Sequence, residues 1–413
     1  MRHDNPIEAL ADLRHEFGEH GGVNMSIEAS STFTVIDPAT MPDIFAGRKG
    51  PESGGCFLYG RHFNPTVFNL GRQLAALEGT EAAYCTASGM GAISAVVMAL
   101  CNAGDHIVSG NAIYGGTWAL LNDFMPAKTG VTTTFIDATN PEGAAAAITD
   151  RTRLIYVESL SNPTLRVSDI PRLAAIARNA GIPLVVDNTF SPLLLSPARL
   201  GADIVIHSLT KFIGGASDLI GGAVCASNEF IGSLMDLHLG PLMVLGPTMD
   251  PHVAGNIALR LPHLALRMKA HAERTQALAE RCAALGVEVC YPGLPSHQDH
   301  DLIRDLHEEE FGYGGLMTID AGSEARAMAL MNQLQNEERF GYVAVSLGYF
   351  DTLMSCSAST TSSEMPGEAL QQAAIRPGLV RMAVGYTGSL EQRWQQLQRA
   401  LERTGLAHCD RAG

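Results

Sequence analysis

Residues 203–215, DIVIHSLTKFIGG, join a short apolar run to a single lysine that is followed by two glycines. Ile204, Val205 and Ile206 predict a buried β-strand. Lys211 comes shortly after that strand, beside hydroxyl-bearing residues. Because open α/β sheets bind their ligands at the carboxyl ends of the strands, this lysine is predicted to lie at a ligand site.

Similar runs recur through the middle of the chain, and each ends at a polar or small residue: HIVSG (106–110), TTTFID (132–137), RLIYVES (153–159) and IPLVVDN (182–188). Between two of them, SDIPRLAAIARNAG (168–181) predicts a helix with Ser168 as N-cap, Pro171 in the first turn and Gly181 at its end. This alternation predicts an α/β fold with a mainly parallel sheet covered by helices.

The chain is expected to divide into three parts. Residues 65–262 carry the strand and helix alternation and form the large domain. Residues 263–413 open and close with long helical patterns and form a smaller α/β domain. Residues 1–64 have little periodicity, and we expect an N-terminal arm that contacts a neighbouring subunit.

Composition excludes several classes of protein. The chain has 413 residues, a formal net charge of −15 and only 28 Lys and Arg residues, so we expect no nucleic-acid partner. Eight cysteines without a CxxC pair predict buried thiols in a reducing compartment, and no metal-binding spacing is found. The N-terminus has no apolar core typical of a secretory signal, and the longest apolar stretch is too short for a bilayer. A soluble cytoplasmic protein is expected.

Lys211 allows two interpretations. An isolated lysine after a strand is most often a surface residue, and most short motif matches are accidental. A buried lysine has a lowered pKa and serves as a proton-transfer base, or as an amine that forms a Schiff base with a carbonyl. Ser208 and Thr210 supply hydroxyl donors, and Gly214 with Gly215 permits close backbone approach. These residues suit an anionic ligand that carries an aldehyde.

Two other segments favour the second interpretation. VVDNTF places Asp187 at a strand end, where a carboxylate can pair with a pyridinium nitrogen. TASGMGAISAVV places Ser88, Gly89 and Met90 at the start of a helical pattern, an arrangement that binds phosphate through backbone N–H groups. Three requirements of one cofactor are therefore met.

The ordered motifs of the chain resemble those of the Cys/Met-metabolism family of pyridoxal 5′-phosphate (PLP) enzymes, which includes cystathionine γ-synthases, cystathionine γ-lyases, methionine γ-lyases and O-acylhomoserine sulfhydrylases. They cover nearly the whole sequence: YGRHFNPT (59–66), ASGMGAI (87–93), YGGT (114–117), ESLSNPT (158–164), VVDNTF (185–190), HSLTKFIGGASDLIGG (207–222), SLG (346–348) and GLVRMAVG (378–385). The resemblance implies PLP-dependent fold type I, as in aspartate aminotransferase, and a homotetramer built from dimers with shared active sites.

The resemblance also implies a set of cofactor-binding residues. Lys211 would bind the cofactor aldehyde covalently, and Asp187 would keep the pyridine nitrogen protonated. The phosphate would be bound by backbone amides, by two hydroxyls and by two residues from the adjacent subunit: Gly89, Met90, Ser208, Thr210, Tyr59 and Arg61.

Other residues would act on the substrate. Tyr114 would stack on the cofactor ring and act as acid or base, and Lys211 would move protons. Arg381 would bind the α-carboxylate in bidentate fashion, with Ser346 near it. Asn162 would lie near the phenolic oxygen of the cofactor. Glu158 is expected to support the site without taking part in the chemistry.

The expected reaction is γ-elimination from an L-amino acid with a leaving group on Cγ, with γ-replacement by a thiol as the alternative. Methionine γ-lyases typically have a cysteine where this chain has Gly116, and cystathionine-processing members have a glutamate where it has Val345. Residues 356–363, CSASTTSS, and the VGYTG segment also depart from the family pattern. These departures favour an oxygen-linked leaving group, as in O-acylhomoserine or canavanine.

Two other classes of function are compatible with the same residues. An aminotransferase of the same fold would use the same lysine and aspartate but would release no ammonia. A catalytically silent scaffold would keep the fold without turnover, which the presence of Lys211, Asp187, Tyr114 and Arg381 argues against.

Overall fold

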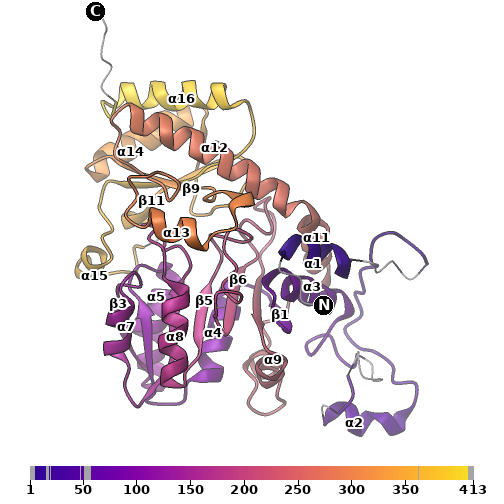
Figure 1. Cartoon of the computed structure of the whole chain (residues 1–413). Coiled ribbons are helices and arrows are strands. Elements are labelled where there is room, and N and C mark those ends of the chain that lie inside the picture. Colours follow the sequence, from indigo (N-terminus) through magenta and orange to yellow (C-terminus); the bar gives the residue numbers. More distant parts are fainter. Residues whose placement is uncertain are drawn as a thin grey trace, which may run out of the picture.

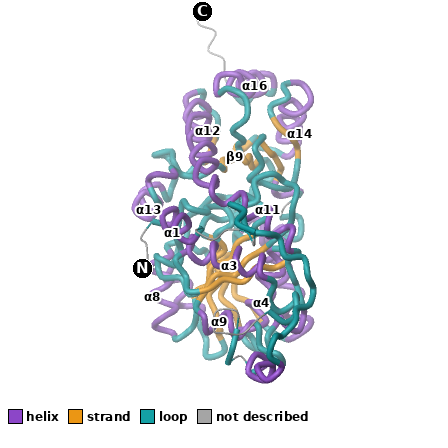
Figure 2. The backbone as a smooth tube through the Cα atoms, turned by 90° about the vertical axis from the view of Figure 1, so that its right-hand side faces the viewer, coloured by secondary structure: helices purple, strands orange, loops and turns teal. Residues whose placement is uncertain are grey.

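The computed structural model describes residues 5–14, 18, 20–46, 48–50, 57–360 and 362–407. Figure 1 shows two β-sheets one above the other, each flanked by helices, with the N-terminal helices to one side. Figure 2, turned by 90°, shows the strands of the large sheet in the middle of the lower layer. The predicted α/β class with a large and a smaller unit is confirmed.

The large sheet has seven strands in the order β1-β7-β6-β5-β4-β2-β3. Their bounds are β1 Ala82–Thr86, β2 His106–Gly110, β3 Thr132–Ile136, β4 Thr152–Glu158, β5 Leu184–Asp187, β6 Ile204–Ser208 and β7 Gly222–Ala226. Only β7 runs antiparallel to its two neighbours. The predicted mainly parallel sheet is therefore confirmed, and each of the five predicted strands lies within two residues of its expected bounds.

Helices cover both faces of this sheet (Figure 1). They are α3 Pro65–Glu78, α4 Gly89–Leu100, α5 Gly115–Ala119, α6 Met125–Thr129, α7 Pro141–Ala147, α8 Ile170–Ala180, α9 Asn228–Leu234, α10 Pro241–Leu245 and α11 Pro251–Arg260. In α8 the predicted N-cap Ser168 is wrong. The cap is Asp169, whose side chain accepts from the Arg172 amide, while Ser168 Oγ donates to the Glu158 carbonyl at 2.7 Å.

The second sheet has five strands in the order β10-β11-β12-β9-β8. Its elements, with the helices that accompany them, are α12 Leu264–Ala284, β8 Val289–Cys290, α13 His300–Leu306, β9 Leu316–Asp320, α14 Glu324–Asn332, β10 Gly341–Val343, β11 Thr352–Cys356, α15 Gly367–Gln372, β12 Leu379–Ala383 and α16 Leu390–Arg403. The boundary predicted between residues 262 and 263 falls in the short 3₁₀ turn Leu261–His263 before α12, and it stays a prediction.

The N-terminal segment includes α1 Pro6–Leu13 and α2 Met41–Phe45. Helix α1 packs on α3, whereas α2 lies away from both sheets in Figure 1. The proposed contact of this arm with a neighbouring subunit stays a prediction. Parts of the arm, together with Cys56 and Cys409, lie outside the described residues.

Alternation along the strands separates two cores on the large sheet. Val186 and Val205 pack into one cluster, and their chain neighbours Val185 and Ile204 pack into the other. A third cluster lies between the small sheet and its helices. Burial on both faces explains why the strands read as continuous apolar runs. No helix in the described part of the chain is long and apolar enough to cross a membrane.

Candidate active site

A cavity of about 220 Å³ opens at the carboxyl ends of β4, β5 and β6, and small-domain residues close it from the other side. Most of the predicted site residues line it: Gly89, Met90, Tyr114, Asn162, Asp187, Ser208, Thr210, Lys211 and Arg381. Segments almost 300 residues apart in sequence thus meet at one place, as expected for the edge of a parallel sheet.

Lys211 lies on the turn that follows β6, and its side chain points into this cavity. Its Nζ donates to Ser346 Oγ at 3.0 Å, a contact between the large and the small unit. Burial, and then the nearby Arg381 charge, lower the pKa of Lys211 to about 8. The structure therefore contradicts the surface-lysine interpretation.

This lowered pKa leads to a prediction for covalent uptake of an aldehyde by the cofactor-free protein. Only the neutral amine attacks a carbonyl, so the uptake rate is expected to rise about tenfold per pH unit up to about pH 8 and to level off above it. Stopped-flow absorbance between about pH 6 and pH 10 measures the rate. Nα-acetyl-lysine is the control, and a protein profile that parallels the free amine would contradict the prediction.

Asp187 ends β5, directly opposite Glu158 at the end of β4. Its Oδ1 accepts from the Thr189 amide at 2.9 Å, and Tyr156 donates its hydroxyl to Oδ2 at 3.3 Å. Burial raises the pKa of Asp187, and the hydrogen bonds from Thr189 oppose that rise. A carboxylate held by donors in a buried site suits a cationic ring nitrogen.

The N-terminus of α4 forms another wall of the cavity. Ser88 caps this helix by accepting from the Gly91 amide at 3.0 Å, so the Gly89 and Met90 amides, which have no intrahelical partner, remain for an anion. A Cβ on Gly89 would lie 2.9 Å from Ser208 Cβ, so only glycine allows β6 to come this close. Thr210 Oγ1 contacts the backbone of Gly221, which fixes the turn.

Arg381 crosses from β12 of the small sheet into the cavity and is 2% exposed. Its Nη1 donates to Asn162 Oδ1 at 3.0 Å and its Nη2 to the Ser346 carbonyl at 3.2 Å, whereas Nε has no hydrogen-bond partner among the described residues. Burial lowers the pKa of Arg381 to about 10, and Glu158 opposes this. A buried guanidinium with an unsatisfied N–H is suited to a carboxylate ligand.

The SLG motif brings Ser346 to Lys211 through close backbone packing. Gly348 has φ +78°, and a Cβ there would lie 2.4 Å from the Phe212 amide nitrogen. Only glycine fits this position, because a side chain would collide with the backbone next to Lys211.

Tyr114 lies at the rim, where it is 43% exposed. Its ring lies over Gly116, and a Cβ on Gly116 would be 2.6 Å from Tyr114 Cε1. A cysteine at position 116 would therefore displace the tyrosine ring from the place it has in this chain. Gly116 therefore leaves room for the Tyr114 ring, in addition to lacking the thiol that a cysteine would provide.

Tyr59 and Arg61 do not line the cavity of their own chain. Arg61 Nη1 donates to the Met243 carbonyl at 2.5 Å, and its guanidinium lies 5.6 Å from the Tyr59 ring. Their predicted role in the adjacent subunit stays a prediction.

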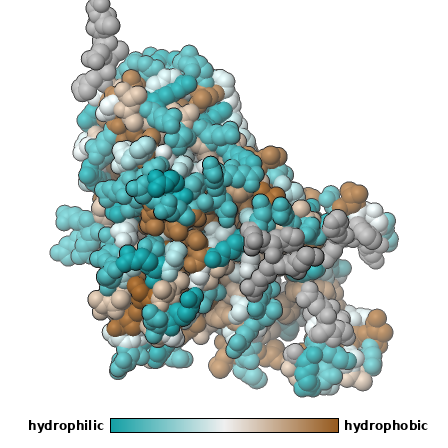
Figure 3. Space-filling view, viewed as in Figure 1, coloured by the Kyte–Doolittle hydropathy of each residue, from teal (hydrophilic) through white to brown (hydrophobic). Residues whose placement is uncertain are grey.

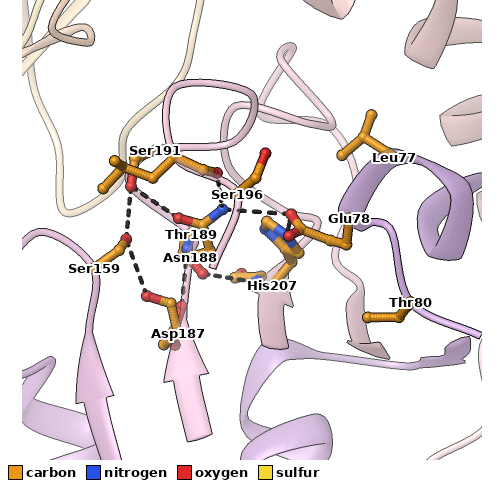
Figure 4. Close-up of polar contacts among 12 residues, drawn as sticks. Leu77, Glu78, Thr80, Ser159, Asp187, Asn188, Thr189, Ser191, Ser196 and His207 are labelled. Atoms are coloured by element: carbon orange, nitrogen blue, oxygen red, sulfur yellow. Dashed lines mark hydrogen bonds and ion pairs between the residues drawn. The ribbon is translucent and has the colours of Figure 1, made fainter. Parts of the chain in front are cut away.

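A buried polar network lies behind the strand ends (Figure 4). His207 Nε2 contacts Glu78 Oε1 at 2.6 Å, and Asn188 Nδ2 approaches the same oxygen at 3.4 Å. Through Asn188 and Ser191 the network reaches Ser159, at the end of β4. The network joins the strand ends that carry Asp187 and Ser208.

The sequence interpretation missed the apolar part of the lining, which includes Ile93, Leu160, Phe190, Ile220 and Leu347. These residues lie inside the quoted motifs, but an apolar residue there gives no signal that separates a ligand wall from a core.

The residues present fit PLP. An anion-binding helix start, a buried carboxylate for a pyridine nitrogen, a lysine with lowered pKa and an arginine with an unpaired N–H lie around one cavity. The fold and the site thus define a PLP-dependent enzyme of fold type I.

Comparison with known proteins identifies the family. The model of the Cys/Met metabolism PLP-dependent enzymes matches residues 9–402, so the chain belongs to this family. It is 54% identical to the methionine γ-lyase of Arabidopsis thaliana over 97% of this chain and 90% of that protein. It is 36% identical to the O-succinylhomoserine sulfhydrylase of Pseudomonas aeruginosa over 89% and 87% of the two chains.

A solved structure of similar fold is the cystathionine γ-synthase of Xanthomonas oryzae pv. oryzae in complex with aminoacrylate and cysteine. It superposes with a TM-score of 0.86 at 32% identity over 97% of this chain and 98% of that one. The prediction of fold type I, PLP dependence and a γ-eliminating carbon–heteroatom lyase is confirmed.

Proposed function

We propose that the substrate of this lyase is L-methionine, which is converted with water to methanethiol, 2-oxobutanoate and ammonia. The apolar mouth of the cavity carries the proposal. Ile220 and Val345 are 64% and 65% exposed at its rim, and Phe190 and Leu347 lie deeper. This lining suits an uncharged thioether. Among the described residues the carboxylates on the cavity, Glu158 and Asp187, are buried and already hydrogen-bonded, so the rim offers no carboxylate for the second amino group of cystathionine.

The similarity to a methionine γ-lyase at 54% identity supports the same substrate. The lack of a cysteine at position 116 does not count against methionine, because the Tyr114 ring takes up the space beside Gly116. The oxygen-linked leaving group favoured by the sequence departures finds mainly apolar side chains at the rim, so it becomes the alternative.

Bound PLP supplies an electron sink that lets negative charge develop beside the amino group of the substrate. Arg381 binds the α-carboxylate and thereby fixes which substrate bonds lie near Lys211. Lys211 accepts and returns protons, which its lowered pKa allows near neutral pH. Tyr114 donates a proton to the leaving sulfur. Asp187 holds a proton at the pyridine nitrogen, and Gly89, Met90, Ser208 and Thr210 bind the phosphate.

A product screen by mass spectrometry tests the substrate. The PLP-loaded protein is offered methionine, cystathionine, O-acetylhomoserine, O-succinylhomoserine and canavanine, each with and without a thiol. Methanethiol and 2-oxobutanoate from methionine, unaffected by the thiol, are the expected products. A thioether or homocysteine that forms only with an acceptor would instead establish γ-replacement, and turnover of canavanine alone would establish the oxygen-linked class.

Substitution of Val345 tests the rim. Val345→Glu is expected to raise kcat/KM for cystathionine relative to methionine by about tenfold, because the carboxylate pairs with the distal ammonium. Val345→Gln, which has nearly the same shape and no charge, is the control. Equal shifts in the two variants would contradict a charge effect.

We further propose a homotetramer of two dimers, in which Tyr59 and Arg61 complete the site of the adjacent subunit. Both residues lie outside their own cavity. Leu239, Val244 and Leu245, around α10, are 86%, 57% and 59% exposed, which suits an interface. Figure 3 shows hydrophobic residues in patches on an otherwise mostly hydrophilic face.

A cytoplasmic location is supported by the free cysteines, of which only Cys290 among those described is not fully buried.

Mixed subunits test the shared site. Arg61→Ala and Lys211→Ala each inactivate the chain, but co-expression is expected to restore about one quarter of the wild-type activity, because half of the random dimers contain one intact site of two. Activity per folded subunit is measured after co-purification with two different tags. No recovery would contradict the shared site.

A further inference from the structure

A buried carboxylate that the proposed chemistry does not use lies between two residues of the site. Glu158 ends β4 and is 7% exposed. Its Oε1 accepts from the Tyr114 amide at 2.7 Å, and its Oε2 accepts from the Asn162 amide at 2.9 Å. Each oxygen thus binds a different loop.

The two loops carry groups with different proposed tasks. Tyr114 is the N-cap residue of α5 and lies at the cavity rim, whereas Asn162 follows β4 and accepts from Arg381 Nη1 at 3.0 Å. From Arg381 the contacts continue to the Ser346 carbonyl and from Ser346 Oγ to Lys211 Nζ. Glu158, Asn162, Arg381, Ser346 and Lys211 are therefore connected, each to the next, by a hydrogen bond.

The two amide donors need a carboxylate in particular. Backbone N–H groups donate to both oxygens of Glu158. A protonated carboxyl or a side-chain amide would place an O–H or N–H donor opposite one of these backbone N–H donors. Burial and the neighbouring Asp187 raise the pKa of Glu158, and the two amides and Arg381 oppose that rise by favouring the ionised form. An anionic Glu158 also faces the Arg381 charge, whose pKa it raises.

We infer that Glu158 is a positioning residue that fixes Tyr114 relative to Asn162 and Arg381, so that proton donor and substrate carboxylate site keep one geometry. Glu158 does not contact the Tyr114 hydroxyl or the Asn162 side-chain amide; it contacts only the backbone amides of these two residues. It acts through the backbone of both loops, and its charge is held where both amides point.

Glu158→Gln tests this inference, because it keeps the size of the side chain and removes one of the two acceptors. In the cofactor-free protein, hydrogen exchange with residue-level fragmentation is expected to show faster exchange at the Tyr114 and Asn162 amides, by about tenfold or more at the amide that loses its acceptor. This measurement needs neither substrate nor cofactor, so it stays valid if methionine is not the substrate.

The loaded enzyme gives a second readout, which rests on the proposed function. Glu158→Gln is expected to lower kcat and raise KM for the preferred substrate, each by about tenfold, since it disturbs both Tyr114 and Arg381. The circular dichroism of the visible cofactor band is expected to change. Combining Glu158→Gln with Tyr114→Phe is expected to give a loss smaller than the product of the two single losses.

Asp105→Asn is the matched control. Asp105 is 8% exposed, accepts from the Asn102 amide at 2.8 Å and lies before β2, at the end of the sheet away from the cavity. It is expected to lose stability while kcat, KM and the cofactor band stay unchanged. Unchanged exchange at both amides in Glu158→Gln, or multiplicative losses with Tyr114→Phe, would overturn the inference. If Glu158→Gln does not fold, hydrogen exchange in the wild-type protein tests the inference, because the Tyr114 and Asn162 amides must both be protected from exchange there.

Discussion

Lys211→Ala is expected to lower kcat/KM by about 10³-fold or more, because it removes both the covalent attachment point of the cofactor and the mobile base. Lys211 is the group whose pKa burial brings to about 8, and its Nζ lies 3.0 Å from Ser346 Oγ, between the two units. Formation of 2-oxo acid measures activity. Borohydride reduction followed by mass spectrometry is expected to add the cofactor mass to the wild-type chain and not to the variant.

Lys211→Arg is the control, since it keeps the positive charge but forms no covalent bond with an aldehyde and gives up no proton near neutral pH. It is expected to be as inactive as Lys211→Ala while binding the cofactor anion more tightly than Lys211→Ala does, because the positive charge is kept. More than about a tenth of the activity in either variant would mean that another group moves the proton.

The sequence predicts the large sheet well because each central strand is buried on both faces and reads as an uninterrupted apolar run. Strands β1 and β7 were not predicted. Ala82–Thr86 (AAYCT) and Gly222–Ala226 (GAVCA) are as long as the other strands, but each has two alanines and a single β-branched residue, so neither reads as a strong strand pattern. The wrong N-cap of α8 has a local cause. Ser168 and Asp169 are adjacent, and serine and aspartate are both common N-cap residues. Here the Ser168 hydroxyl donates to the Glu158 carbonyl, and Asp169 caps the helix.

The site is predictable where chemistry and local sequence coincide, as for Lys211 after its strand or Gly89 at the start of a helix. It is not predictable where the partner comes from a distant segment. His207 meets Glu78 across 129 residues, and Arg381 meets Asn162 across 219. The position of Glu158 at a strand end is visible in the sequence, but its two amide donors depend on how two loops return to it.

The pair of Glu78 and His207 shows how such distant contacts support the site. Glu78, at the end of α3, is 1% exposed, and His207 on β6 is 0% exposed. Beyond their mutual contact, Glu78 Oε2 and His207 Nδ1 have no partner in the described part of the chain. The pair lies directly behind the cavity, because Ser208 follows His207 and Asn188, which contacts Glu78, follows Asp187 (Figure 4).

Glu78→Ala is expected to lower the free energy of unfolding by about 3 kcal/mol or more, because it leaves a buried imidazole N–H without its acceptor. Chemical denaturation followed by far-UV circular dichroism measures this. Asp301→Ala removes an exposed ion pair with Arg304 and is expected to lose less than about 1 kcal/mol. Replacing both Glu78 and His207 with leucine is expected to recover most of the loss, since apolar side chains need no partner there.

Cofactor affinity, measured by equilibrium dialysis, is expected to fall in Glu78→Ala and not in Asp301→Ala, because the pair anchors the strand ends that carry Asp187 and Ser208. Equal stability of the two single variants would mean that the pair does not hold these strand ends.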